Sequence, residues 1–159
     1  MYARFDNIKI INCYGPTECT FAVTSYDIIK RIQNAEDIPV GVPKKDVRIY
    51  IVDEEKNSIR DGEIGEILII GESVADGYLG NITNNSFIQY NGEKAYLTGD
   101  LGYIKNGILY YKARKDKQIK FKGYRIELTD IENNLQELDY IDRAIAIANK
   151  NKENKVLNM

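Results

Sequence analysis

Hydrophobic and polar residues alternate with a period of two along much of this chain, and that pattern predicts β-strands. Residues 47–53 (VRIYIVD) alternate in this way, whereas residues 66–71 (EILIIG) are apolar at consecutive positions. The first segment predicts a strand with one buried face, and the second predicts a strand buried on both faces. The turn-forming sequence 61–65 (DGEIG) lies between them.

The clearest local prediction is a β-hairpin within residues 96–116. Asn106-Gly107 separates two strand-like stretches there, and this dipeptide favours a two-residue turn. Residues 118–128 (QIKFKGYRIEL) continue the strand-like alternation. The chain is therefore expected to be mostly β in its first three quarters.

One helix is predicted after these strands. Thr129 and Glu132 match a capping box, and apolar residues follow at helical spacing. Residues 143–149 (RAIAIAN) alternate as a strand would, and the polar stretch 150–159 predicts a loop or a frayed end. The fold class that these patterns predict is α+β, mostly β.

The charged sequence 112–118 (KARKDKQ) joins two strand-like parts, and we place a subdomain boundary there, near Lys115 and Asp116. The predicted organisation is a β-rich part over 1–114, a junction at 115–116 and a shorter part over 117–159. A β-β-α-β unit of this last length is small to stand alone.

Composition excludes several classes of function. The 159 residues are 43% hydrophobic and 29% charged with a formal net charge of −2, so no basic field favours nucleic acid. No apolar run reaches the length of a membrane span, and the first ten residues lack a signal peptide's apolar core. Two cysteines, Cys13 and Cys19, form no disulfide framework, so we expect a cytoplasmic protein.

The sequence contains no histidine. This excludes catalytic sites of the Ser-His-Asp and Cys-His types, and also zinc or iron sites that need histidine. Two cysteines are too few for a cysteine-only zinc site. Any chemistry must therefore use carboxylates, Lys, Arg, Tyr, Thr and backbone groups.

The sequence YGPTE at 14–18 is the first candidate site. Gly15 and Pro16 predict a tight turn, which would present the oxygens of Thr17 and Glu18 together. A hydroxyl beside a carboxylate suits a phosphate-and-magnesium site. The alternative is that Thr17 or Glu18 caps the next element.

Three more polar groups recur along the chain, at 98–100 (TGD), 113–116 (ARKD) and 122–128 (KGYRIEL). Each has an ordinary structural explanation, because Asp100 suits a turn and Arg114 a solvated surface. Together with Tyr14 they suit a nucleotide. An aromatic ring can stack on a purine, a carboxylate can accept ribose hydroxyls, and a guanidinium can reach ribose or phosphate.

The order and spacing of four strings resemble the AMP-forming adenylating enzymes, which include acyl-CoA synthetases, luciferases and nonribosomal peptide synthetase adenylation domains. The strings are NCYGPTE at 12–18, GEIGEILIIGESVADGYLG at 62–80, YLTGD at 96–100 and ARKDKQIKFKGYRIELTDIE at 113–132. Within the family, they look most like members that activate D-alanine with ATP and load it onto the phosphopantetheine thiol of a carrier protein, for teichoic acid D-alanylation.

The resemblance implies a role for each matching position. Tyr14 and Gly15 would bind the nucleotide with Asp100 and Arg114, where Tyr14 stacks on adenine, Asp100 holds the ribose hydroxyls and Arg114 supports the ribose. Thr17 would contact the α-phosphate, and Glu18 would bind Mg²⁺.

The remaining implied roles concern the hinge and the substrate. Asp116 would be the hinge of a rotating C-terminal subdomain, and Gly123 would line the thiol tunnel in the thiolation state. Cys13, Phe21 and Ala22 would line the amino-acid pocket. The implied fold is the β-barrel-like end of a large adenylation subdomain, followed by the start of a small α/β subdomain.

The chain departs from the family pattern in ways that indicate a fragment. Ala113 replaces the usual Gly before Arg114, which is a mild change. The glycine-rich phosphate loop, the late lysine and the aspartate that binds the amino group have no counterpart here. We therefore expect these residues alone to adenylate very weakly or not at all. We also expect an exposed apolar face to promote a homo-oligomer or a domain-swapped dimer.

Two alternatives stay open at this stage, and a third is disfavoured. The chain could belong to a nonribosomal peptide synthetase that activates another amino acid, or it could be a truncated, non-catalytic module that binds a carrier protein. An RNA-binding β-barrel that uses KFKGYR is disfavoured by the acidic balance and by the lack of an aromatic platform.

Overall fold

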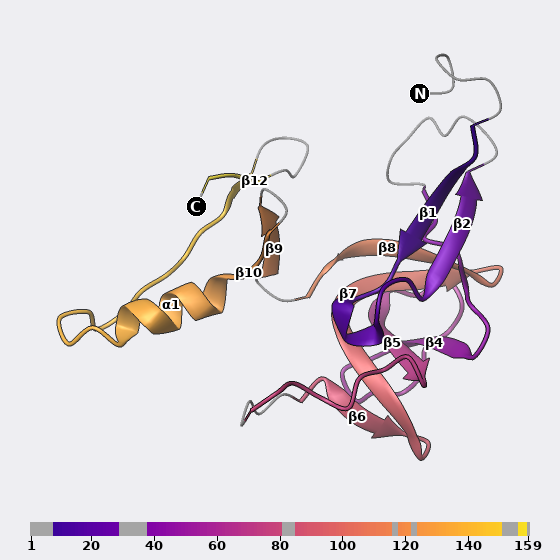
Figure 1. Ribbon diagram of the computed structural model, residues 1–159, viewed down its shortest axis with the longest axis horizontal. Coiled ribbons are helices and arrows are strands. Elements are labelled where there is room, and N and C mark those ends of the chain that lie inside the picture. The colour runs from indigo at the N-terminus through magenta and orange to yellow at the C-terminus, as the bar shows by residue number, and fades with distance from the viewer. Residues whose placement is uncertain are drawn as a thin grey trace. The chain divides into compact units, whose positions relative to one another are not determined.

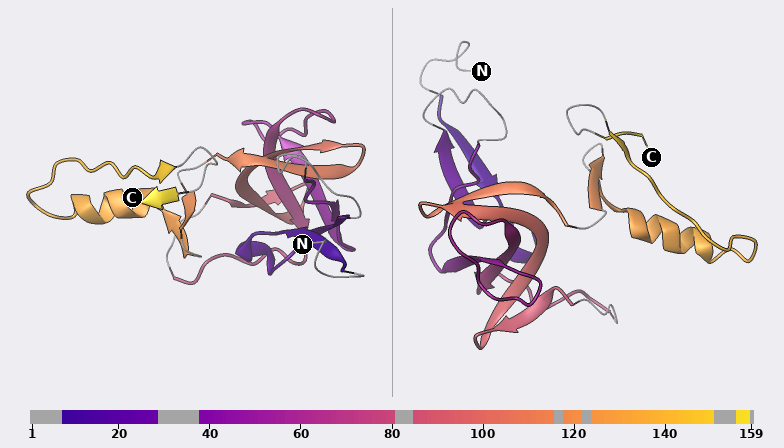
Figure 2. Two further views of the ribbon diagram at one scale, coloured as in Figure 1. Left: turned by 90° about the horizontal axis from the view of Figure 1, so that it is seen from above. Right: turned by 180° about the vertical axis from the view of Figure 1, so that it is seen from behind.

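The computed structural model describes residues 8–28, 38–80, 85–115, 118–121, 124–150 and 156–158. The chain forms two compact units, Met1–Lys115 and Asp116–Met159. Both units can be followed in Figures 1 and 2. Antiparallel pairing joins the strands within each unit, and one α-helix is found among the described residues. The predicted fold class, α+β and mostly β, is confirmed.

The first unit contains two sheets. Its strands are β1 (Ile10–Tyr14), β2 (Thr24–Ile28), β3 (Val42–Pro43), β4 (Val47–Val52), β5 (Gly65–Gly71), β6 (Phe87–Tyr90), β7 (Glu93–Lys105) and β8 (Ile108–Arg114). The small sheet has the order β1-β2-β3. The large sheet has the order β4-β5-β7-β6, and β8 also pairs with β7. The long strand β7 curves through this sheet and meets β5, β6 and β8 (Figure 1).

Strand β5 forms the centre of the core, as its continuous apolar sequence predicts. Ile67 and Ile69 lie in the larger hydrophobic cluster, which also includes Val23 from the loop before β2. Leu68 and Ile70 belong to a second cluster. Because successive residues of a strand face opposite sides, these memberships confirm a strand buried on both faces.

Two hairpin turns rest on the same local chemistry. Asn106 and Gly107 have φ of 52° and 75°, as the two-residue turn between β7 and β8 requires. The β6–β7 turn uses Asn91 and Gly92, with φ of 52° and 81°. The first turn confirms the prediction. The second carries the same Asn-Gly signal but was not predicted.

The second unit contains β9 (Gln118–Phe121), β10 (Tyr124–Glu127), α1 (Leu128–Gln136), β11 (Asn149–Lys150) and β12 (Val156–Asn158). The predicted helix is confirmed, but its predicted capping box is wrong. Glu127, not Thr129, is the N-cap residue, and the Glu127 side chain makes no capping hydrogen bond. The buried Glu132 carboxylate instead accepts a hydrogen bond of 3.0 Å from the Ala146 backbone amide.

The strand predicted over 143–149 is also wrong for most of its length. Residues 143–148 form no strand, and Ile145 and Ile147 are exposed. Pairing begins only at β11, whose partner β12 lies in the tail that we expected to be loop or frayed. Alternation alone could not reveal this, because a strand also needs a neighbour for its backbone groups.

None of the helices in the described ranges is long and apolar enough to cross a membrane.

Candidate functional site

The loop after β1 is a closed structure built around Gly15. Pro16 leads into a short 3₁₀ helix, Thr17–Cys19, and the Val23 amide donates back to the Tyr14 carbonyl at 2.8 Å. A Cβ atom on Gly15 would lie 2.4 Å from the Phe21 carbonyl oxygen and 2.9 Å from Val23 N. The predicted turn is therefore the start of a longer loop, and that loop closes only over a residue without a side chain.

The loop gives its two candidate catalytic residues different environments. Thr17 is exposed, whereas Glu18 is buried. Both lie within the 3₁₀ helix whose N-cap residue is Pro16, so neither of them is the N-cap residue of that helix. The alternative that treated this pair as an ordinary cap is therefore wrong.

Glu18 is held by the segment after β5. The Tyr78 hydroxyl donates to Glu18 Oε1 at 2.5 Å, and the Ala75 amide donates to the Glu18 backbone carbonyl at 2.9 Å. The buried Tyr96 lies close by, and burial, then hydrogen bonding with Tyr78 and the charge of Glu18, raise the pKa of its phenol. Sequence reasoning gave Tyr78 no role, although it lies within one of the four family-like strings.

Tyr14, Asp100 and Arg114 form one hydrogen-bonded cluster. The Tyr14 hydroxyl donates to Asp100 Oδ2 at 2.6 Å, and an Arg114 guanidinium nitrogen donates to Asp100 Oδ1 at 3.1 Å. Burial, reinforced by the Asp100 charge, raises the pKa of the Tyr14 phenol. The side chain of Asp100 is only 8% exposed and that of Arg114 21%. Asp100 is thus no surface turn residue, and Arg114 is no solvated charge.

A bulge in β7 directs Asp100 into this cluster. The pairing of β5 with β7 changes register between Glu66 and Leu68, so Thr98–Asp100 lie opposite Ile67 alone. The Thr98 hydroxyl donates to the Ile67 carbonyl at 2.8 Å and accepts from the Asp100 amide at 3.1 Å. Gly99 has φ of +70°, which favours glycine. Each residue of TGD therefore has a distinct part in the bulge.

The side chains of this cluster are of the kinds that bind a nucleotide. One oxygen of Asp100 accepts from the Tyr14 hydroxyl and the other from Arg114, and a carboxylate held in this way is a group that can accept hydrogen bonds from ribose hydroxyls. Tyr14 adds an aromatic ring beside that carboxylate, 6.5 Å from the ring of Tyr111.

These residues could bind Mg²⁺ only together with phosphate and water ligands. No group of three or more metal-ligating side chains occurs among the residues that the structure describes. Mg²⁺ is commonly held by one or two carboxylates together with substrate phosphates and water. Glu18 could supply one such carboxylate.

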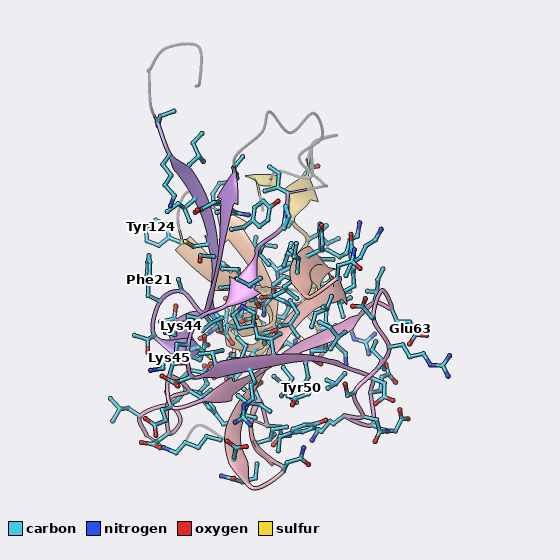
Figure 3. All side chains as sticks on the ribbon, turned by 90° about the vertical axis from the view of Figure 1, so that its right-hand side faces the viewer. Phe21, Lys44, Lys45, Tyr50, Glu63 and Tyr124 are labelled. Atoms are coloured by element: carbon cyan, nitrogen blue, oxygen red, sulfur yellow. The ribbon has the colours of Figure 1, made fainter. Side chains whose placement is uncertain are left out.

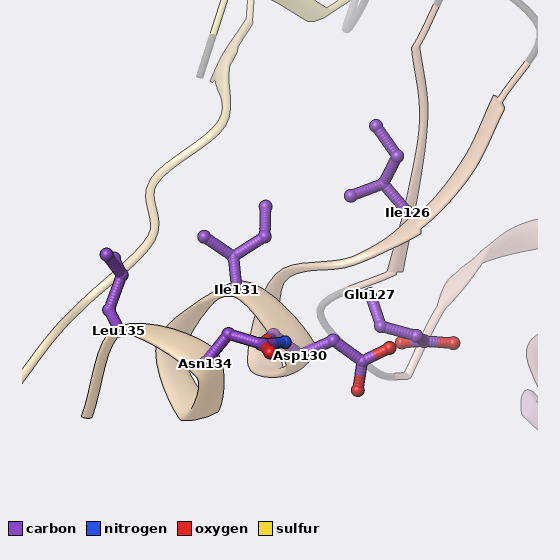
Figure 4. Close-up of a pocket in the computed structure, with 6 residues that line it drawn as sticks. All are labelled: Ile126, Glu127, Asp130, Ile131, Asn134 and Leu135. Carbon is purple, nitrogen blue, oxygen red and sulfur yellow. The ribbon is translucent and has the colours of Figure 1, made fainter. Parts of the chain in front are cut away.

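The residues predicted to line the substrate pocket are not enclosed by the described part of the chain. Cys13 is exposed, Ala22 is half-buried, and Phe21 projects from its loop with 81% of its surface exposed (Figure 3). The groove found in the second unit lies along α1 and involves none of these residues. Its lining is Ile126, Glu127, Asp130, Ile131, Asn134 and Leu135 (Figure 4). The predicted hinge Asp116 and tunnel residue Gly123 lie outside the described residues.

The raised pKa values of one thiol and two phenols predict a loss of stability at high pH. Burial, with the nearby Glu18 charge, raises the pKa of the Cys19 thiol from 9.0 to about 12, and the phenols of Tyr14 and Tyr96 are also raised. Each of these groups binds its proton more tightly in the folded state than in the unfolded state. Its contribution to the free energy of unfolding is therefore complete below the unfolded pKa and is lost as pH rises from there toward the folded pKa. The free energy of unfolding should therefore fall as pH rises from about 9.

Urea unfolding between about pH 8 and pH 11 measures this fall. Replacing Cys19 with alanine should move its onset toward the tyrosine range, near pH 10. A free energy of unfolding that stays constant over the whole range would contradict the prediction.

Comparison with known proteins identifies relatives of this chain. Residues 1–79 match a family model described as AMP-binding enzyme. The chain is 46% identical to a D-alanine–D-alanyl carrier protein ligase of Bacillus cytotoxicus, and the match covers 94% of this chain and 30% of that protein. A ligase with the same name from Listeria monocytogenes is 48% identical, over 96% of this chain and 31% of the relative. The chain thus spans about 30% of the length of these curated relatives.

Solved structures give the same result. A nonribosomal peptide synthetase protein with adenylation and PCP domains superimposes with a TM-score of 0.78 at 28% identity, over 98% of this chain and 32% of that one. The Vibrio cholerae adenylation domain AlmE, solved with glycyl-adenosine-5′-phosphate, gives 0.77 at 30% identity, over 93% of this chain and 30% of that one. The chain therefore belongs to the AMP-binding enzyme family.

Proposed function

We propose that this chain is the nucleotide-binding portion of an AMP-forming ligase that activates D-alanine and transfers it to a carrier protein. The observation that carries the proposal is the Tyr14–Asp100–Arg114 cluster, in which a nearly buried carboxylate is held beside an aromatic ring and a guanidinium group. The names of the relatives, at 46% and 48% identity, support the choice of D-alanine and of a carrier protein.

In the proposed reaction, a carboxylate oxygen of D-alanine forms a bond to the α-phosphorus of ATP, and the bond to the β-phosphate breaks. Pyrophosphate leaves, and aminoacyl-adenylate remains. A thiol then attacks the acyl carbon and AMP leaves, so the acyl group becomes a thioester. A bound Mg²⁺ would neutralise phosphate charge during the first step.

The chain's own residues contribute mainly binding and orientation. Asp100 holds the ribose hydroxyls, Arg114 keeps the Asp100 carboxylate in place through its hydrogen bond, and Tyr14 stacks its ring on adenine. Thr17, exposed at the tip of the loop, donates its hydroxyl to the α-phosphate, and Glu18 supplies the magnesium carboxylate. Tyr78 fixes the Glu18 carboxylate through its hydroxyl.

The further assignments rest on the resemblance. Asp116 is proposed as the hinge between a part over 1–114 and a part over 117–159, and Gly123 as the residue at the thiol tunnel. Cys13, Phe21 and Ala22 are proposed to line the amino-acid pocket once the remaining portion of such an enzyme covers them.

Amino-acid-dependent ATP–pyrophosphate exchange tests the proposal, measured on the full-length gene product with D-alanine, L-alanine and a panel of small amino acids. A strong preference for D-alanine is expected. Exchange with another amino acid instead would assign the chain to a peptide synthetase. An absence of exchange with every amino acid would overturn the proposed function.

A further inference from the structure

Glu66 has no part in the site described so far, but its carboxylate contacts the residue directly before Asp100. Glu66 Oε1 accepts a hydrogen bond of 2.9 Å from the Gly99 amide, and Glu66 Oε2 lies 3.4 Å from the Lys115 ammonium nitrogen. The side chain of Glu66 is 14% exposed. We propose that Glu66 is a positioning residue that holds the Thr98–Asp100 bulge and so aims the Asp100 carboxylate at the ribose. The link to ribose rests on the proposed function.

The bulge creates the need for this carboxylate. In a regular antiparallel ladder, a backbone amide of β7 finds a carbonyl on its neighbouring strand. The register change opposite Ile67 leaves more amides on β7 than carbonyls on β5. The Thr98 hydroxyl accepts a hydrogen bond from the Asp100 amide, and the Glu66 carboxylate accepts one from the Gly99 amide. A side-chain acceptor therefore replaces the missing carbonyl at the residue directly before Asp100.

The same carboxylate ties the bulge to the end of the first unit. The Lys115 backbone amide donates to the Gly99 carbonyl at 2.6 Å, and its ammonium group pairs with Glu66. Both polar groups of Gly99 are thus engaged, one by Glu66 and the other by Lys115. Arg114, the ladder partner of Asp100, immediately precedes Lys115. Glu66 therefore contacts both the bulge that carries the Asp100 carboxylate and the end of the strand that carries its guanidinium partner.

The two contacts of Glu66 contribute unequally to holding the bulge. Lys115 is 47% exposed, and an ion pair at such a surface contributes little. The bond from Gly99 is partly buried and replaces a missing ladder bond, so its loss leaves an amide without its acceptor. The positioning effect should therefore follow the hydrogen bond more than the charge.

Three variants of the full-length gene product separate these contributions. Glu66→Ala removes both contacts, Glu66→Gln keeps an oxygen for the Gly99 amide, and Lys115→Met removes only the ion pair. Glu55→Gln, which changes an exposed carboxylate in a turn, is the control. For each variant we would measure deuterium uptake of the segment 97–101 by mass spectrometry, kcat and the KM values for ATP and D-alanine in pyrophosphate exchange, and the melting temperature.

Glu66→Ala should speed deuterium uptake of that segment and raise the KM for ATP by about tenfold, with kcat and the KM for D-alanine nearly unchanged, because ribose binding is lost away from the reacting phosphorus. Glu66→Gln and Lys115→Met should stay within about threefold of wild type. A merely structural role would instead lower the melting temperature and the active fraction without raising the KM for ATP.

An unchanged KM for ATP in folded Glu66→Ala would overturn the proposal, and so would unchanged deuterium uptake. If the wild-type protein shows no pyrophosphate exchange, the proposed function fails. The deuterium comparison still decides whether Glu66 holds the bulge.

Discussion

Replacing Asp100 with alanine should reduce ATP-dependent pyrophosphate exchange by at least about a hundredfold, because hydrogen bonds to a charged group contribute about 1.5–3 kcal/mol each and the ribose offers two hydroxyls. The change also removes the acceptor of the Tyr14 hydroxyl and of Arg114. Their loss should loosen β8 against β7 and lower the melting temperature. Steady-state exchange kinetics and a thermal melt of the same sample measure both effects.

Asp76→Ala is a matched control, since Asp76 also pairs with a basic residue, Lys94, but lies on the exposed surface. It should leave the KM for ATP and the melting temperature close to wild type. Asp100→Ala with a KM for ATP within about threefold of wild type would show that the ribose binds elsewhere.

Replacing Gly15 with alanine should both destabilise the protein and inactivate it. The new methyl group would lie within 2.9 Å of three backbone atoms, from Phe21, Ala22 and Val23, and backbone cannot rotate away as a side chain can. Overpacking of this kind costs about 1–3 kcal/mol. Opening the loop would also break the bond from Val23 to Tyr14 and displace Glu18, so exchange should fall by more than stability alone explains.

The variant Gly92→Ala is a control that separates the cost of adding a Cβ atom to a glycine in general from the clash within the loop at Gly15. Gly92 has φ of +81° in the β6–β7 turn, and a Cβ atom there would meet nothing within 4 Å. This variant should lose about 1 kcal/mol of stability from its backbone conformation alone and keep its exchange activity. Equal losses of exchange in the two variants would show that the closure of the loop at Gly15 has no special role.

Much of the architecture follows from local sequence. The buried strand β5 and the Asn106-Gly107 hairpin are correct because period, apolar content and turn chemistry are properties of neighbouring residues. The Asn91-Gly92 turn could have been found by the same signal. The capping box at Thr129 failed because Glu132 found a distant backbone partner, Ala146, which no local rule contains.

The sequence by itself determined which residues are chemically competent: the chain has no histidine, and Tyr14, Glu18, Asp100 and Arg114 lie in three of its four ordered motifs. Only the tertiary structure decided how they are held. Tyr14 and Asp100 are 86 positions apart, and Glu18 and Tyr78 are 60 apart, so strand pairing and loop closure bring them together. Glu66 reaches Gly99 because a register change leaves an amide without a ladder partner. Long-range hydrogen bonds of this kind depend on which strands are neighbours, and the periodicity of a single strand does not specify its neighbours.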